Sequence, residues 1–160
     1  MTHEAAIRVA RSADSDAIFA LWCESMRYHE SLDPLIFGFD VTRAQEAKKF
    51  LAEHMGKETS LVLVACKNGK IVGYLLGSIC TRLPFQKLHE VGHIYDIVVT
   101  EGERRHGIGT LLLDQAFSFF NDRGHDTVML SVSDKNSMAL RFYEKHGFVT
   151  YVRNMVRRKR

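Results

Sequence analysis

Residues 104 to 110 read Arg104-Arg105-His106-Gly107-Ile108-Gly109-Thr110, and they separate a β-rich run from a helical pattern. Backbone N–H groups in the first turn of a helix have no partners within the helix, and the helix dipole favours an anion there. Glycines at positions 107 and 109 let a phosphate approach the backbone closely. This stretch predicts a strand-to-helix turn that can hold a pyrophosphate, although a glycine-rich turn with no ligand has the same local sequence.

Two other phosphate-binding motifs are excluded by the spacing of the glycines. A dinucleotide-binding loop requires a third glycine at the position that Leu112 occupies. A P-loop requires Gly-Lys followed by Ser or Thr, and neither Gly56-Lys57 nor Gly69-Lys70 is followed by a hydroxyl residue. The sequence therefore indicates neither of these two classes of protein.

Further along the chain, two polar residues lie on a predicted short helix at 137–146. Asn136 and Tyr143 are seven residues apart in the sequence, which is about two helical turns, so they share one face. An amide and a phenol aligned in this way can hold an amide-rich ligand and donate a proton. They also fit a purely structural role, in which Asn136 caps the helix and Tyr143 packs with its hydroxyl in water.

The rest of the chain changes between strand and helix periodicity and predicts one mixed α/β sheet. Asn68-Gly69 lies between two apolar runs and is the strongest short hairpin signal in the sequence. Predicted strands are 7–11, 61–65, 71–80, 91–100 and 127–132, followed by a final extended segment at 148–156. Predicted helices are one that follows the caps Ser12 and Asp14 and ends near 29, and others at 42–55, 108–124 and 137–146. We expect a single domain, residues 1–160, with helices on both faces of the sheet.

His89-Glu90-Val91-Gly92-His93 matches the H-E-x-x-H signature of zinc proteases. That chemistry requires a helix, which places both histidines on one face. Here the match continues through Gly92 into a β-rich run, and Asp96 and Val99 stand where the extended motif has a glycine and a third histidine. We predict a strand and no metal, with a zinc hydrolase as the alternative that metal analysis would reveal.

The charge of the protein is concentrated at its C-terminal end. The 160 residues carry a formal net charge of +3, and 46% of them are hydrophobic, as in ordinary folded proteins. Five of the 22 basic residues lie in the last eight positions, and without them the balance is −2. Binding to nucleic acid would have to rest on this tail, residues 152–160, so we do not expect it for the body of the protein.

The cysteines and the apolar runs indicate a cytoplasmic protein. Cys23, Cys66 and Cys80 are an odd number in mostly apolar surroundings, which indicates reduced thiols. No apolar run approaches the roughly 18 residues of a membrane span. The N-terminus has no apolar core followed by a cleavage site, so we expect no secretory signal and no contact with a membrane.

Taken together, the two motifs resemble those of the GNAT superfamily of acyl-CoA N-acyltransferases. Residues 104 to 109 are similar to the family's Q/R-x-x-G-x-G/A pyrophosphate loop, and Asn136-x-x-Ala139-x-x-Phe142-Tyr143-x-x-x-Gly147-Phe148 is similar to its second hallmark. The match covers most of the chain and is strongest from Val91 to Phe148. It implies a mostly antiparallel sheet whose fourth and fifth strands, near 91–100 and 127–133, splay apart between helices on both faces.

The resemblance implies acetyl-CoA as co-substrate. A bulge near Ile97–Val99 would expose backbone groups to the pantetheine arm. Backbone N–H groups of residues 105–110 would hold the pyrophosphate, Asn136 would bond the pantetheine arm, and Tyr143 would lie beside the sulfur. The cofactor-binding residues implied by the match are Ile97, Val98, Val99, Arg104, Arg105, His106, Gly107, Ile108, Gly109, Thr110, Asn136 and Tyr143.

The reaction implied by the resemblance is direct acyl transfer to a primary amine. Many members carry a carboxylate base on the fourth strand or at the end of the fifth, where Tyr95 and Ser131 stand in this chain. His93 falls where some members have a base, so we predict that it deprotonates the amine through water. Tyr143 would protonate the departing thiolate, and backbone N–H groups of the fourth strand would stabilise the oxyanion.

The acceptor is a small-molecule amine or an amine of a peptide or protein. Aromatic and acidic side chains indicate a cationic amine, and the predicted substrate-binding residues are Tyr28, Tyr95 and Asp96. On a regular strand the side chains alternate between the two faces. Residues on one face would then be His93, Tyr95 and Ile97, and residues on the other would be Ile94, Asp96 and Val98.

Two further classes of function stay open. One is a module that binds acyl-CoA without turning it over, which release of free CoA on adding amines would exclude. The other is an RNA- or ribosome-associated protein, for which loss of binding on deleting residues 157–160 and a steep salt dependence would be diagnostic. The resemblance also implies a homodimer formed through the last strands.

Overall fold

One five-stranded sheet forms the centre of the computed structural model, which describes residues 4–38, 40–85 and 87–157. The strands lie side by side in chain order: β1 (Ala6–Val9), β2 (Ser60–Lys67), β3 (Lys70–Thr81), β4 (Glu90–Val99) and β5 (Val128–Leu130). The helices are α1 (Ser15–Leu32), α2 (Val41–His54), α3 (Ile108–Asn121) and α4 (Ser137–Lys145), with short 3-10 turns at Ser12–Asp14 and Glu101–Glu103. In this described part of the chain, no helix combines the length and the apolar character needed to cross a membrane.

The first four strands pair antiparallel, and β5 pairs parallel to β4. The hairpin predicted at Asn68-Gly69 joins β2 to β3, and both residues have positive φ, at +50° and +73°. Positive φ at both central residues is what a type I′ turn requires, and this turn matches the twist of the flanking strands. The hairpin prediction is therefore confirmed.

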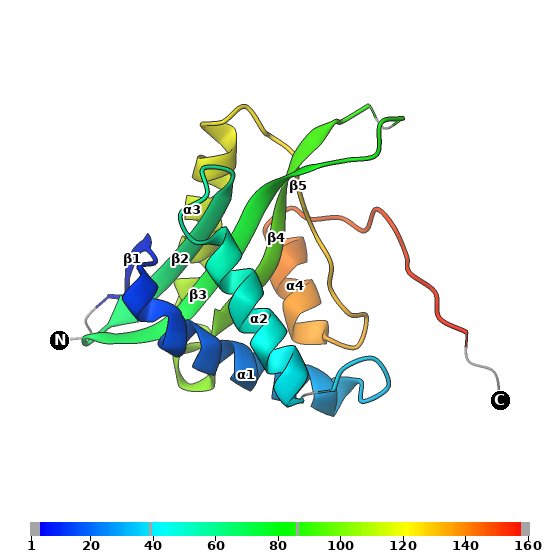
Figure 1. Ribbon diagram of the computed structural model, residues 1–160. Coiled ribbons are helices and arrows are strands. Elements are labelled where there is room, and N and C mark those ends of the chain that lie inside the picture. Colours follow the sequence, from blue (N-terminus) through cyan, green and yellow to red (C-terminus); the bar gives the residue numbers. More distant parts are fainter. Residues whose placement is uncertain (1–3, 39, 86, 158–160) are drawn as a thin grey trace.

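Helices cover both faces of the sheet, as predicted (Figure 1). Helices α1 and α2 pack on one face, where Ile18 and Leu51 contact strand residues such as Val64 and Tyr74. Helix α3 packs on the other face through a fully buried stripe: Ile108, Leu112, Leu113, Ala116 and Phe120. Phe142 of α4 packs against this second cluster, so α3 and α4 lie on the same side of the sheet.

Strands β4 and β5 separate after a short ladder. They pair only where Gly92–Ile94 meets Val128–Leu130, whereas β4 continues for five more residues to Val99. The predicted splay between the fourth and fifth strands is thereby confirmed. Beyond Ile94, the edge of β4 that faces β5 has no strand partner in the described residues, so its backbone polar groups are available to a ligand.

The bulge on β4 lies two residues earlier than predicted. The β3–β4 ladder is regular from Gly73–Val99 to Leu76–Asp96, and the register then shifts so that Gly77 pairs with Ile94. Tyr95 is therefore the extra residue, and the prediction of a bulge near 97–99 is wrong. The expected alternation is also wrong beyond Ile94, because one extra residue reverses the side-chain direction of everything that follows.

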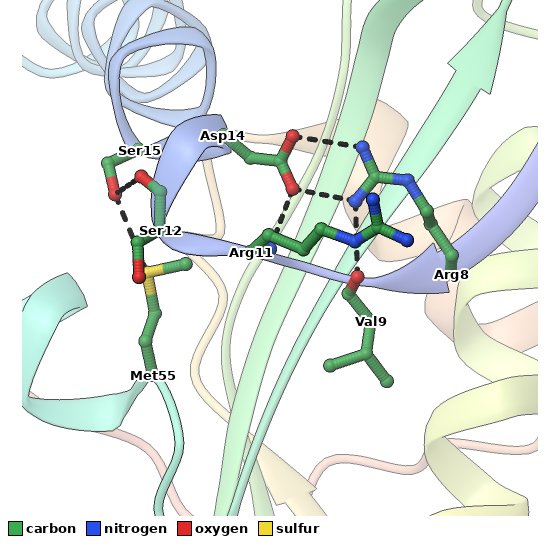
Figure 2. Close-up of polar contacts among 7 residues, drawn as sticks. All are labelled: Arg8, Val9, Arg11, Ser12, Asp14, Ser15 and Met55. Carbon is green, nitrogen blue, oxygen red and sulfur yellow. Dashed lines mark hydrogen bonds and ion pairs between the residues drawn. The ribbon is translucent and has the colours of Figure 1, made fainter.

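The junction between β1 and α1 is held by a two-pronged ion pair (Figure 2). Both guanidinium NH groups of Arg8 donate to the two carboxylate oxygens of Asp14, at 2.6 and 2.9 Å. The backbone N–H of Arg11 also donates to Asp14, at 2.7 Å. Asp14 therefore precedes the helix, as predicted, but its carboxylate ties the strand to the turn and does not cap the helix.

The C-terminal segment differs from the prediction. Residues 148–157 form neither helix nor strand and extend away from the sheet (Figure 1). The final strand is therefore not formed within the described chain, because β5 has only three paired residues and nothing pairs with its outer edge. Within the basic tail, Arg158, Lys159 and Arg160 lie outside the described residues.

Candidate active site

A groove of about 450 Å³ opens where β4 and β5 separate. Its walls come from β4, from the turn before α3 and from one face of α4. Four of its lining residues belong to β4 and the glycine turn: Ile97, Val99, Gly107 and Gly109. A groove of this volume falls within the usual range of about 300–1,000 Å³ for small-molecule and cofactor sites.

The turn before α3 has the backbone of an anion-binding site. Arg105 and Gly107 adopt left-handed conformations, with φ of +65° and +82°. The first N–H of the helix that is bonded belongs to Leu111, which donates to the Gly107 carbonyl at 3.0 Å. The N–H groups of residues 105–110 find no acceptor in the described chain. Alternating backbone conformations with several unpaired N–H groups form a concave site for anions.

Arg104 positions this turn. Its Nε donates to the Val99 carbonyl at 2.8 Å, and its guanidinium lies 3.6 Å from the Glu24 carboxylate of α1. The same guanidinium stacks over the ring of Tyr28, 5.6 Å from its centroid. Arg104 thus links β4, the glycine turn and α1, and the ring of Tyr28 packs against its guanidinium.

Helix α4 supplies the opposite wall of the groove. Asn136 is buried, and its side-chain oxygen accepts from the Ala139 N–H at 3.1 Å, so it caps the helix. His146 joins the two helices, because its Nε2 lies 3.1 Å from Thr110 Oγ1 and its Nδ1 lies 2.8 Å from the Phe142 carbonyl. This bridge fixes α4 beside the start of α3.

Tyr143 lines the groove from α4 and is half-buried. Its ring packs against Phe142 and Phe148, with centroids at 5.4 and 5.6 Å. Burial, with the nearby Asp96 carboxylate, raises the pKa of the Tyr143 phenol well above its ordinary value. The hydroxyl therefore keeps its proton throughout the physiological pH range.

The groove includes most, but not all, of the predicted cofactor-binding residues. Side chains or backbone of eight of them line it: Ile97, Val99, Arg104, Arg105, Gly107, Gly109, Thr110 and Tyr143. Four lie elsewhere: Val98 and Ile108 are buried in the two cores, His106 is exposed beside Glu103, and Asn136 caps α4. The sequence reasoning missed further lining residues, namely Glu103, Met138, Ala139, Phe142, Lys145 and His146. Helical spacing from Tyr143 would have found two of these, Ala139 four residues before it and His146 three residues after it.

The bulge at Tyr95 brings the remaining predicted residues to the opposite face of β4. The His93 and Tyr95 rings lie 4.8 Å apart, and Tyr95 packs edge-on against Phe50 of α2. The Tyr95 hydroxyl lies 3.1 Å from both Ser78 Oγ and Cys80 Sγ. Burial and the charge of Arg82 lower the pKa of His93, which favours the neutral imidazole.

Asp96 shares that face because the bulge has reversed the alternation. It lines a small cavity against Tyr74 and α1, not the groove. Protein atoms enclose its carboxyl group, and burial raises its pKa above the ordinary value, while Tyr74 and His29 lower it only in part. The charge of Asp96 contributes to the raised pKa of Tyr143. The Asp96 carboxylate therefore acts electrostatically on a groove residue from the other face of β4.

No metal centre is found in the part of the chain that the structure describes. No three His, Cys, Asp or Glu side chains there converge closely enough to hold an ion. His93, the second histidine of the H-E-x-x-H match, lies within β4, so the helix that a zinc protease needs is not formed.

The site thus combines a split sheet, an anion-binding turn and a tyrosine on the facing helix, which is the arrangement that the two motifs led us to expect for an acyltransferase. The sequence profile of the acetyltransferase (GNAT) family matches residues 16–148. The chain therefore belongs to the GNAT family, as its two motifs predicted.

Curated relatives are named as N-acetyltransferases. An N-alpha-acetyltransferase of Sulfurisphaera tokodaii is 34% identical over 106 residues, which cover 62% of this chain and 62% of that protein. The match thus spans less than two thirds of that relative's length. An uncharacterized N-acetyltransferase of Archaeoglobus fulgidus is 27% identical over 137 residues, 86% of this chain and 88% of that protein.

Solved structures share the whole fold. A tetramutant of the BH1408 protein from Bacillus halodurans superposes with a TM-score of 0.87 at 25% identity, covering 96% of this chain and 99% of that one. The aminoglycoside acetyltransferase AAC(6')-Iy, in complex with a bisubstrate analog, gives a TM-score of 0.73 at 17% identity, covering 99% of both chains. At that identity the likeness establishes the fold alone.

Proposed function

We propose that the protein is an acetyl-CoA-dependent N-acetyltransferase that moves the acetyl group directly to a primary amine. The observation that carries this proposal is the groove itself, with an anion-binding turn at one end and Tyr143 in its wall. AAC(6')-Iy, which shares the fold, is known in complex with CoA, and this supports the same co-substrate here. The three described cysteines are free thiols, which supports a cytoplasmic site of action.

The turn would hold the pyrophosphate of the co-substrate. Backbone N–H groups of residues 105–110 have no acceptor in the described protein, and helix α3 starts at Ile108 with its positive dipole end toward them. The exposed Arg105 adds a cation at the same place. Next along the groove, Ile97 and Val99 present the unpaired edge of β4 to the amide groups of the pantetheine arm. Asn136 does not line the groove, and its side-chain oxygen caps α4, so we assign it the role of fixing the start of the helix that carries Tyr143.

Tyr143 would act as the acid. Its raised pKa keeps the phenol protonated, so it can donate a hydrogen bond to the sulfur as the C–S bond breaks. Because a thiolate with a pKa near ~8.5 is a weaker base than tyrosinate, full proton transfer needs a proton to reach Tyr143 at once. The nitrogen of the tetrahedral intermediate provides it, because it becomes cationic on attack and must lose a second proton as the amide forms.

The structure adds a candidate for the general base, the group that deprotonates the acceptor amine. An alkylammonium has a pKa near ~10.4 and must lose a proton before it can attack the thioester. Burial lowers the pKa of the half-buried His93, and neither His93 nor Asp96 lines the groove in the described structure. Asp96 interacts electrostatically with Tyr143 and has a raised pKa, so it combines proximity with basicity. We propose Asp96 as the base, with His93 as the alternative acting through water.

The direct test is a turnover assay that follows free CoA thiol. The purified protein is mixed with acetyl-CoA and a panel of primary amines, which includes alkylamines, aminoglycosides and short peptides. We expect CoA release that depends on both substrates and yields the acetylated amine. Tight CoA binding without release in the presence of any amine would instead identify a binding module.

A further inference from the structure

The C-terminal end of α4 is tied to the anion-binding turn by the side chain of His146. This residue follows Lys145, the last residue of the helix, and its imidazole bonds in two directions. Nδ1 lies 2.8 Å from the Phe142 carbonyl oxygen, and Nε2 lies 3.1 Å from Thr110 Oγ1. Since a carbonyl oxygen only accepts, Nδ1 carries the proton, and Nε2 of the neutral ring then accepts from the Thr110 hydroxyl. Both ring nitrogens are therefore engaged by protein atoms.

Thr110 belongs both to this link and to the proposed phosphate site. Its backbone N–H is one of those at residues 105–110 that find no acceptor in the described chain, and its hydroxyl holds His146. Thr110 and His146 both line the groove. A phosphate held by the N–H groups of the turn and the helix that carries Tyr143 would therefore be positioned by the same residue.

His146 is connected as closely to Tyr143. The backbone N–H of His146 donates to the Tyr143 carbonyl at 3.0 Å, and both residues line the groove. The rings of His146 and Phe142 lie 4.5 Å apart, and a Cβ added at Gly109 would lie 3.3 Å from the Phe142 ring. The last turn of α4 and the first turn of α3 are thus in close contact at this point.

Polar contacts at its two ends locate α4. The helix has nine residues, none of them fully buried, and a helix of that length is not stable by itself in water. The Asn136 side chain caps the first turn, and the bond between His146 and Thr110 secures the other end. A shift at that end would move Tyr143 relative to the turn.

We infer that His146 is a positioning residue for acetyl transfer, which through Thr110 sets the distance between the turn that holds the co-substrate and the Tyr143 hydroxyl. This inference rests on the proposed function and adds to it a residue that acts through Tyr143. Misplacement of a reacting group by about 1 Å can lower a rate by roughly 10²-fold. Loss of the bond should therefore lower kcat, whereas coenzyme A affinity should change little because the N–H groups of the turn stay in place.

The test measures kcat from CoA release and the coenzyme A Kd by calorimetry in variants of the two bonded residues. Thr110→Val keeps the shape and the backbone N–H but removes the hydroxyl, and His146→Leu removes both ring nitrogens. We expect each to lower kcat by roughly 10- to 100-fold, with the Kd changed less than about threefold. Thr110→Ser keeps a hydroxyl at the same place and should hold kcat within about threefold of the wild-type value. His125→Leu, beyond the end of α3, is the matched control and should change neither quantity.

Combined variants separate positioning from a merely structural effect. If the two residues act through one bond, adding His146→Leu to Thr110→Val should lower kcat no further than the larger of the two single losses. If the bond acts through Tyr143, His146→Leu should also have almost no effect on kcat in the Tyr143→Phe background. Losses that multiply in either combination would overturn the inference.

The outcomes also distinguish this inference from the proposed function. Unchanged kcat in both Thr110→Val and His146→Leu would reject the positioning role and keep the acetyltransferase. Failure of the wild-type protein to release CoA with any amine would reject both. If His146→Leu does not fold, the comparison of Thr110→Val with Thr110→Ser decides, because both are small changes at a half-buried position, and equal kcat values in these two would overturn the inference.

Discussion

Gly92 shows how one residue can mislead a motif search and still be indispensable. It lies inside the H-E-x-x-H match, but a Cβ added there would lie 2.6 Å from the ring of Phe120 on α3. The glycine is present because β4 and α3 pack closely at this point. The motif is therefore explained by packing in the core and not by metal chemistry.

Replacing Gly92 by Ala should destabilise the fold. The new methyl group overlaps a fully buried ring, and overpacking of this kind typically destabilises by about 1–3 kcal/mol. Urea denaturation would measure the loss. The double variant Gly92→Ala with Phe120→Leu should recover part of the stability that either single change removes, whereas additive losses would show that the two residues do not clash.

Tyr143→Phe should separate chemistry from binding. The phenyl ring keeps the packing against Phe142 and Phe148, but the hydroxyl that we propose as the donor to the leaving sulfur is gone. We expect kcat to fall by roughly 10²-fold with little change in coenzyme A affinity. Comparable turnover in both proteins across a pH series would remove Tyr143 from the role of proton donor.

The pH dependence should identify the base. A base works only when deprotonated, so kcat/KM falls as the pH drops through its pKa, which is raised for Asp96 and lowered for His93. Asp96→Asn should abolish the acid limb of the profile and most of the activity, and His93→Gln should leave that limb in place. The reverse pattern would reassign the base to His93.

Among the elements, β4 shows where sequence reasoning succeeds and where it stops. Apolar periodicity located the strand to within a residue at each end, since Glu90–Val99 was predicted as 91–100. It could not reveal the bulge, because Tyr95 and Asp96 interrupt no apolar pattern and the extra residue becomes visible only in the β3–β4 register. The face of the sheet on which Asp96 lies relative to His93 and Tyr95 was therefore mispredicted, whereas the choice of His93 as the base stays a prediction.

The groove was predictable to the extent that motifs mark it. The glycine turn and Tyr143 carry recognisable signatures, and eight of the predicted cofactor residues line the groove. His146 carries no recognisable sequence signature. Its bridge to Thr110 joins residues 36 positions apart and depends on how α4 docks against α3. The aromatic cavity around Asp96 could not be predicted from the sequence either, because its lining residues come from α1, α2, β3 and β4.

The β1–α1 junction should make stability depend on pH at the acidic end. The Arg8 guanidinium, the larger cause, and the Arg11 N–H lower the pKa of Asp14 to about 2 from an ordinary 3.8. A depressed folded-state pKa gives stabilisation that is complete above the unfolded value and lost as the pH falls toward 2. Asp14→Asn should therefore lower the free energy of unfolding by about 1–2 kcal/mol at pH 7, after allowance for solvent screening, and by almost nothing near pH 2.

Asp40→Asn is the control for this measurement. Asp40 pairs with Arg43 at 3.2 Å, but both side chains are more than half exposed. Asn can also keep the N-cap bond that Asp40 accepts from the Arg43 N–H. The change should therefore alter stability by less than about 0.5 kcal/mol. A larger loss at pH 7 for Asp40→Asn than for Asp14→Asn would contradict the importance given to the junction.

The described part of the C-terminal segment exposes several large apolar side chains. Val149, Tyr151, Val152, Met155 and Val156 are 65–96% exposed, and β5 is an edge strand of the sheet. An exposed edge beside an apolar extended segment favours pairing with another chain. We therefore expect a homodimer, in which the final strand missing from the single chain forms against a second copy.

Light scattering coupled to gel filtration would test this expectation. The wild-type protein should elute with twice the mass of 18.3 kDa, and a chain ending at Phe148 should elute as a monomer. A monomeric wild-type protein at micromolar concentration would contradict it.

Calorimetric titration of the ligand-free protein with acetyl-CoA tests the cofactor groove most directly. We expect one molecule bound per chain, with at least tenfold weaker binding of pantetheine, which lacks the pyrophosphate and so forfeits the charge-assisted bonds to the turn before α3. Absence of any acetyl-CoA uptake, or equal affinity for pantetheine, would show that the unpaired N–H groups of residues 105–110 do not serve this ligand.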